Sequence, residues 1–123
     1  MKGDLVHFEI VANDADKLAA FYSKVLGWEI GEAMAKMGDY RLIKTAGGDK
    51  AVGGGLYPRT MPQQAGLNYY DVEDIEAASA KVTEAGGQVV MPKMAVPKMG
   101  WMAVVLDPEG NGFGLWVMDE NAM

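Results

Sequence analysis

The chain has 123 residues and a mass of 13.2 kDa, which fits one domain because compact domains cluster near about 100 to 150 residues. Half of the residues are hydrophobic and 23% are charged, so the chain can form a packed core and is not of the disordered class. A formal charge of −6 disfavours nucleic-acid binding, since an acidic surface repels phosphates. The lack of cysteine excludes disulfides and thiolate chemistry, and the single histidine, His7, excludes zinc centres built from two or three histidines of one chain.

The first elements in chain order are a strand and a helix. Residues 6–11 are rich in β-branched and aromatic side chains and predict a strand. Asn13 and Asp14 can cap a following helix, which Gly27 ends. The expected buried stripe of this helix, at i, i+3, i+4 and i+7, is Leu18, Phe21, Tyr22 and Val25. Glycines then punctuate three expected strands, near residues 28–34, 39–45 and 51–57.

About sixty residues later the same order returns. Residues 67–72 predict a strand, Glu73 or Asp74 a cap, and Gly86-Gly87 a helix stop. The helical stripe consists of Ile75, Ala78, Val82 and Ala85, and the following strands are expected near 88–91, 100–106 and 112–118. The chain therefore reads as two β-α-β-β-β modules, at about 4–57 and 67–118, joined by a linker at 58–66. The fold class is α+β.

Three segments carry a resemblance to a known family. They are Val6-His7-Phe8-Glu9-Ile10, the helix end Phe21-Tyr22-Ser23-Lys24-Val25-Leu26-Gly27-Trp28, and Asp107-Pro108-Glu109-Gly110-Asn111 followed by Phe113-Gly114-Leu115-Trp116. With the paired modules, they resemble the vicinal oxygen chelate superfamily of glyoxalases, bleomycin-resistance proteins and extradiol dioxygenases. The resemblance implies two curled mixed sheets around a cleft with a divalent metal on its floor.

The resemblance also implies metal ligands on the first and last strand of each module, and this chain keeps one of the four. His7 matches the first ligand, but the other positions fall on Leu67 or Asn68, on Gly54 or Gly55, and on Gly114. We therefore expect no metal cofactor. If a metal binds, its ligands would be His7 and Glu9, which lie two apart on one strand, with a third from Asp71, Tyr69 or water.

Strand alternation predicts which side chains face the cleft. If Phe8 and Ile10 pack under the helix, His7 and Glu9 face the cleft. Tyr69, Trp101 and Trp116 are the aromatic candidates to line it, although aromatic residues on strands more often pack in the core. Glycine at two ligand positions is expected to widen the cavity.

His7 and Glu9 are expected to stabilise each other's charge, which would raise the imidazole pKa and lower that of the carboxyl group. Burial alone would instead lower the pKa of His7. A buried, purely structural His7–Glu9 pair is the alternative to a functional one.

The expected function is binding of a small molecule in the cleft between the modules, without metal catalysis. The alternative is a metal-dependent lyase, isomerase or dioxygenase that uses His7 and Glu9, and a third possibility is a structural or interaction module. The start of the chain lacks an apolar signal segment, so a cytoplasmic protein is expected, with no membrane or nucleic-acid partner. A homodimer is expected because the sheets of this fold leave edges that need cover.

Overall fold

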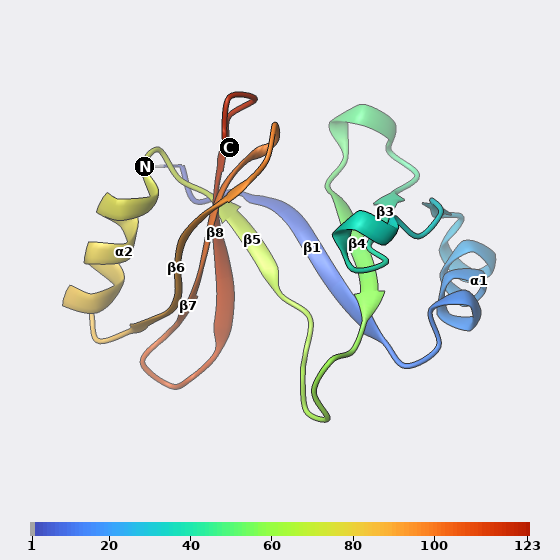
Figure 1. Cartoon of the computed structure of the whole chain (residues 1–123), viewed down its shortest axis with the longest axis horizontal. Helices are drawn as coiled ribbons and strands as arrows, with labels where there is room; N and C mark the ends of the chain where they lie inside the picture. Colours follow the sequence, from blue (N-terminus) through green and yellow to red (C-terminus); the bar gives the residue numbers. More distant parts are fainter. Residues whose placement is uncertain (1) are drawn as a thin grey trace. The chain divides into compact units, whose positions relative to one another are not determined.

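The computed structural model describes residues 2–123, which form two α-helices and eight strands (Figure 1). The elements are β1 Leu5–Ala12, α1 Ala15–Leu26, β2 Glu29–Ile30, β3 Arg41–Lys44, β4 Gly53–Pro58, β5 Asn68–Asp71, α2 Ile75–Glu84, β6 Gln88–Val96, β7 Gly100–Leu106 and β8 Gly112–Met118. This order confirms the α+β class and the repeated β-α-β-β-β pattern. The chain divides into two compact units, residues 7–67 (the first unit) and residues 2–6 with 68–123 (the second unit).

Matching caps explain why both helices begin and end where the sequence predicts. Asp14 accepts a hydrogen bond from the backbone N–H of Lys17 at 3.1 Å, and Asp74 accepts one from Ala77 at 2.9 Å. Each helix is followed by a glycine in the left-handed region, Gly27 at φ 72° after α1 and Gly86 at φ 96° after α2.

In the first unit, α1 covers one face of a sheet with the strand order β2-β3-β4-β1. Strand β1 runs parallel to β4, and the other neighbours are antiparallel. The core is made of Ala12, Ile43 and Leu56, and Phe8, Ile10, Ala15, Leu18 and Ala19 pack against it. The expected helical stripe is partly wrong, because Phe21 and Val25 are 54% and 59% exposed. Ala15 and Ala19 pack toward the sheet beside Leu18 instead.

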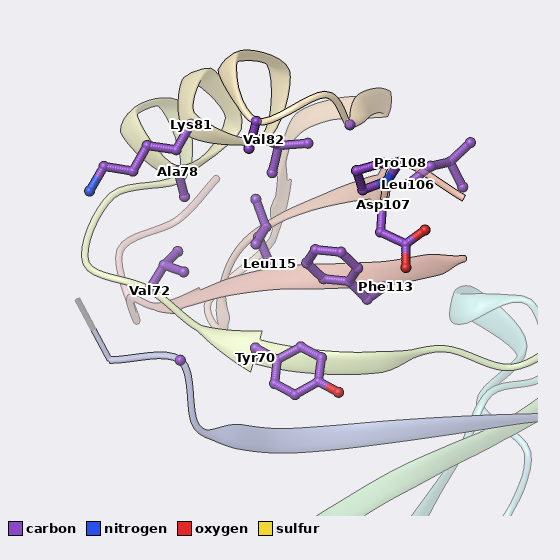
Figure 2. Close-up of a pocket in the computed structure, with 13 residues that line it drawn as sticks. Tyr70, Val72, Ala78, Lys81, Val82, Leu106, Asp107, Pro108, Phe113 and Leu115 are labelled. Atoms are coloured by element: carbon purple, nitrogen blue, oxygen red, sulfur yellow. The ribbon is translucent and has the colours of Figure 1, made fainter. Parts of the chain in front are cut away.

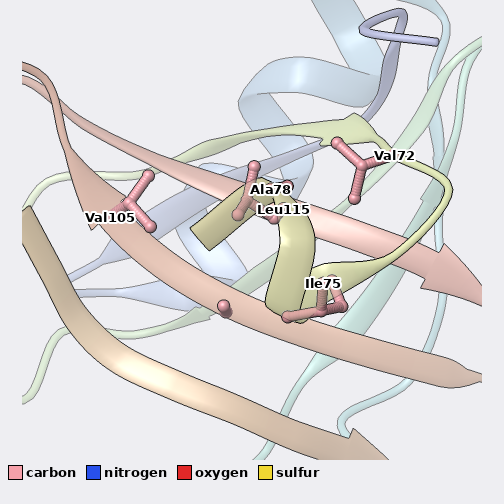
Figure 3. Packing of buried hydrophobic residues seen from close by; sticks show 6 residues of the cluster. Val72, Ile75, Ala78, Val105 and Leu115 are labelled. Atoms are coloured by element: carbon pink, nitrogen blue, oxygen red, sulfur yellow. The ribbon is translucent and has the colours of Figure 1, made fainter. Parts of the chain in front are cut away.

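In the second unit, α2 lies beside a sheet with the order β5-β8-β7-β6, in which β5 is parallel to β8 (Figure 1). Its core joins α2 to the inner strands, as Figure 3 shows. The buried members are Val72, Ile75, Ala78, Ala103, Val105 and Leu115. Their burial removes apolar surface from water, which is the main source of stability in a domain of this size.

Two strands differ from their predicted lengths. The strand expected at 28–34 is only Glu29–Ile30, because the chain then turns into a short 3₁₀ helix at Ala35–Met37. Strand β6 continues past Pro92 to Val96, with register shifts on either side of Met91. A proline is tolerated there because β6 is the edge strand of its sheet. Within residues 2–123, no helix has the length and apolar character needed to cross a membrane.

Candidate small-molecule site

The face of the first unit's sheet that points away from α1 carries a group of polar side chains. Phe8 and Ile10 pack toward α1, so His7 and Glu9 project from the opposite face of β1, as the alternation predicts. The same alternation on β4, where Leu56 is fully buried, places Tyr57 on this opposite face.

Tyr40 connects His7 to Glu9. Its hydroxyl donates a hydrogen bond to Glu9 Oε2 at 3.0 Å and lies 2.7 Å from His7 Nε2. Because the hydroxyl hydrogen goes to Glu9, the Tyr40 oxygen accepts from His7, and Nε2 carries the imidazole hydrogen. His7 Nε2 and Glu9 Oε2 are themselves 4.0 Å apart, so the phenol is the nearer partner of both groups.

The predicted increase in the pKa of His7 is contradicted by this environment. Burial lowers the pKa of His7 from its ordinary value of 6.5, because desolvation disfavours the imidazolium. The carboxylate lies beyond hydrogen-bond distance of the imidazole, and the group that meets the ring is a neutral phenol. The pair is therefore joined by the hydrogen-bonded bridge of Tyr40 and not by a direct hydrogen bond between imidazole and carboxylate.

Tyr57 is a second phenol at the same carboxylate. Burial, the negative charge of Glu9 and a hydrogen bond to Glu9 raise the pKa of Tyr57 to about 12. The rings of Tyr40 and Tyr57 stack, with centroids 5.6 Å apart and an interplanar angle of 14°. Glu9, whose side chain is only 13% exposed, thus interacts with two phenolic groups.

The Tyr40 ring occupies the space above Gly55. Residue 55 lies opposite Glu9 in the parallel pairing of β1 with β4, and a Cβ atom built there would collide with the Tyr40 hydroxyl and ring. Gly114, opposite Tyr69 in the second unit, is covered in the same way by the Tyr69 ring. The expectation that these glycines widen a cavity is therefore wrong, because a tyrosine ring fills each space.

In the second unit, Tyr69 and Trp116 lie on the face of the sheet away from α2. Leu115 packs under α2, so its neighbours Gly114 and Trp116 point the other way. A hollow of about 560 Å³ borders Trp116 and is lined by Lys98, Met99, Trp116, Met118, Asp119 and Glu120.

Trp101 lies on the other face, against the core under α2. Its indole N–H donates to Asp119 at 3.0 Å, and the Lys93 ammonium lies 4.7 Å from the centre of its ring. The structure therefore does not bring Trp101 together with Trp116 and Tyr69. Strand register explains this: in the pairing of β7 with β8, Met102 and not Trp101 lies opposite Trp116.

The residues at the four expected ligand positions do not fit a metal centre. His7 donates its Nε2 hydrogen to Tyr40, and tyrosine rings cover Gly55 and Gly114. The remaining position, Leu67 or Asn68, supplies no histidine or carboxylate. Across residues 2–123, no cluster of three or more His, Cys, Asp or Glu side chains is placed to hold an ion.

Tyr40 and Tyr57 were absent from the residues predicted from the sequence. They lie 31 residues or more beyond Glu9 in the chain, on or beside other strands of the sheet. Strand alternation could have indicated their face. Ile43 and Leu56 are buried, so the residues that alternate with them, which include Tyr40 and Tyr57, lie on the opposite face of the sheet.

The chain belongs to the Glyoxalase/Bleomycin resistance protein/Dioxygenase superfamily, whose family model matches residues 4–115. It is 34% identical over 118 residues to a Mycobacterium bovis protein named "Putative glyoxylase CFP32", covering 92% of this chain and 43% of that protein. The chain thus spans less than half of the length of this relative. A shorter match, 42% identical over 48 residues, covers 39% of this chain and 18% of the anthracycline biosynthesis protein DnrV of Streptomyces peucetius.

Solved structures share the fold at low sequence identity. A hypothetical protein of Bacillus halodurans, BH1468, has a TM-score of 0.73 at 16% identity, covering 100% of this chain and 99% of that one. Methylmalonyl-CoA epimerase of Mycobacterium tuberculosis has a TM-score of 0.68 at 17% identity, covering 93% and 86% of the two chains.

Proposed function

We propose that this protein binds a small molecule at the face carrying His7, Glu9, Tyr40 and Tyr57, without a metal ion. The observation that carries the proposal is the position of the Tyr40 hydroxyl, which bridges His7 and Glu9 while the ring fills the space above Gly55. A side chain held by two hydrogen bonds is preorganised, so it can meet a ligand without a large loss of conformational entropy.

The chemistry of the face favours a flat ligand with hydrogen-bonding groups. The stacked rings of Tyr40 and Tyr57 offer an aromatic wall, and phenols combine apolar surface with a polar end. The match to an anthracycline biosynthesis protein supports the same class, because anthracyclines are flat and carry several oxygens. The earlier prediction that the ligand lies in a cleft between the two modules stays a prediction.

A fluorescence titration with an anthracycline tests the proposal directly. We expect saturable binding to the wild-type chain that is weakened at least about tenfold in Tyr40→Phe, which corresponds to about 1.4 kcal/mol. Tyr22→Phe is the matched control, because Tyr22 stacks on Trp28 away from this face. Equal binding by wild type and Tyr40→Phe would remove the site from this face. No binding of any flat oxygenated aromatic compound would overturn the proposed ligand class.

A homodimer also remains a proposal. The exposed Phe21 and Val25 of α1 and the edge strands β2 and β6 are the surfaces that such a contact would cover. Light scattering during size-exclusion chromatography measures the mass, and a monomer at tens of micromolar would contradict this proposal.

A further inference from the structure

A second hollow lies within the second unit, on the opposite side of its sheet from Tyr69 and Trp116. It has a volume of about 380 Å³, within the range of roughly 300 to 1,000 Å³ typical of small-molecule sites. Figure 2 shows Ala78 and Val82 of α2 pointing toward Leu115 and Phe113 of β8 across this space. The floor is therefore apolar and is supplied by two elements that pack against each other.

The repeat shows which aromatic side chains of the first unit have no counterpart beside this space. In the first unit, Trp28 follows the left-handed Gly27 by one residue, stacks on Tyr22 at 5.1 Å and contacts Phe8 at 5.3 Å. In the second unit, the residue after the left-handed Gly86 is Gly87. The indole that fills the space between helix and sheet in one unit has no counterpart in the other.

Tyr22, on which the Trp28 indole stacks, also has a smaller counterpart in the second unit. Counted from the capping aspartates Asp14 and Asp74, Val82 takes the place of Tyr22. Both Val82 and Gly87 line the hollow. Beside the hollow, the second unit therefore has a valine and a glycine in place of the stacked Tyr–Trp pair. The hollow lies next to Gly87 and not directly over its Cα, because a Cβ atom there would meet the Leu106 carbonyl oxygen at 2.5 Å and Val82 Cγ1 at 2.7 Å.

The remaining walls favour an aromatic, uncharged occupant. Tyr70 and Phe113 form an edge-to-face aromatic pair at 5.8 Å on the sheet side. The Asp107 carboxylate at the rim already accepts from Asn111 and from the backbone N–H of Glu109. The Lys81 ammonium points away from the labelled lining residues in Figure 2. The lining is thus mainly apolar and aromatic, and its two charged side chains either point away, as Lys81 does, or already accept hydrogen bonds at the rim, as Asp107 does.

We propose that this hollow, named here the α2 pocket and bounded by Tyr70, Ala78, Val82, Gly87, Phe113 and Leu115, binds a neutral aromatic molecule of indole size. The ligand lies beside Val82 and Gly87, the residues that correspond to the stacked Tyr22 and Trp28 of the first unit. This site is separate from the His7 face and does not rest on the function proposed for that face.

Titration with 5-fluoroindole, followed by ¹⁹F and ¹H–¹⁵N NMR, tests the α2 pocket. We expect saturable shifts centred on Val82, Phe113 and Leu115. Val82→Trp places an indole from the chain itself in the pocket and should weaken binding at least tenfold. Ala85→Trp serves the same purpose from the exposed end of the helix if Val82→Trp does not fold.

The controls separate this pocket from the other face. Tyr22→Trp changes the corresponding position of the first unit and should leave 5-fluoroindole binding unchanged, as should Tyr40→Phe. Absence of saturable binding, unchanged binding in the folded blocking variant, or shifts centred on Tyr40 and Tyr57 would each overturn the proposal. Loss of anthracycline binding at the His7 face would not contradict the proposal for the α2 pocket.

Discussion

The phenol of Tyr40 lies directly over Gly55, in the space where the side chain of any larger residue at position 55 would begin. The same relation joins Tyr69 to Gly114 in the second unit. The two rings reach their glycines from different strands: Tyr69 lies directly opposite Gly114 in the β5–β8 pairing, whereas Gly55 lies opposite Glu9 and is covered by Tyr40 from beside β3. In both units, therefore, a tyrosine ring stands at the position where the family resemblance implies a metal ligand.

Gly55→Ala should force Tyr40 out of its position. The added methyl group overlaps the Tyr40 ring, and overpacking of this kind costs about 1 to 3 kcal/mol. Urea unfolding measures the loss. Gly31→Ala is the matched control, because its Cβ would meet nothing closer than the Leu42 carbonyl oxygen at 3.7 Å. Equal stability of the two variants would show that the space above Gly55 is free.

Tyr40→Phe should destabilise the fold through lost hydrogen bonds alone. The substitution keeps the ring and removes the hydroxyl that contacts both His7 and Glu9, at an expected cost of about 1 to 3 kcal/mol. Chemical denaturation of this variant beside Tyr22→Phe isolates the hydroxyl at this position. If both variants lose the same amount, the bridge contributes nothing to stability.

His7 should titrate below its ordinary pKa of 6.5, because burial opposes protonation. The folded protein then binds this proton less readily than the unfolded chain does. The associated stability is fully present above the unfolded pKa and is lost as the pH falls through the lower, folded value. Because the chain has one histidine, an NMR titration of its imidazole resonances is unambiguous. A folded pKa above 6.5 would restore the directly coupled His7–Glu9 pair.

Tyr57 should remain protonated to unusually high pH. Its pKa of about 12 has burial as its largest cause, followed by the charge and hydrogen bond of Glu9. Stability linked to Tyr57 is present below its ordinary pKa of 10 and is lost as the pH rises toward the folded value. Ultraviolet titration of tyrosinate absorbance should show that Glu9→Gln lowers the pKa of Tyr57. An unchanged titration curve would mean that Glu9 and Tyr57 are not in contact.

The sequence predicted the repeat well because its signals are local. An aspartate cap, a left-handed glycine and the strand that follows lie within one element and its neighbours, as at Asp74 and Gly86. The bridge of Tyr40 could not be found in that way. It depends on the pairing of three strands, which brings Tyr40 to His7 across 33 residues.

Alternation along a strand predicts the relative faces of residues on that strand only, and not of residues on two different strands. The face of His7 and Glu9 follows directly from Phe8 and Ile10, because neighbouring residues of one strand point to opposite faces. Trp101 and Trp116 lie on different strands, so their faces depend on the β7–β8 register, which places the two indoles on opposite faces.

The measurement that tests the central claim most directly is isothermal titration of the wild-type protein with Ni²⁺, Zn²⁺, Mn²⁺ and Fe²⁺, each in parallel with His7→Ala. Tyr40 and Tyr69 fill the space above two expected ligand positions, and a single imidazole with one carboxylate makes a weak site for these ions. We predict no saturable binding at micromolar concentrations and the same heats for both proteins. Micromolar or tighter binding of one ion per chain, abolished by His7→Ala, would contradict a metal-free site and favour the metal-dependent lyase, isomerase or dioxygenase.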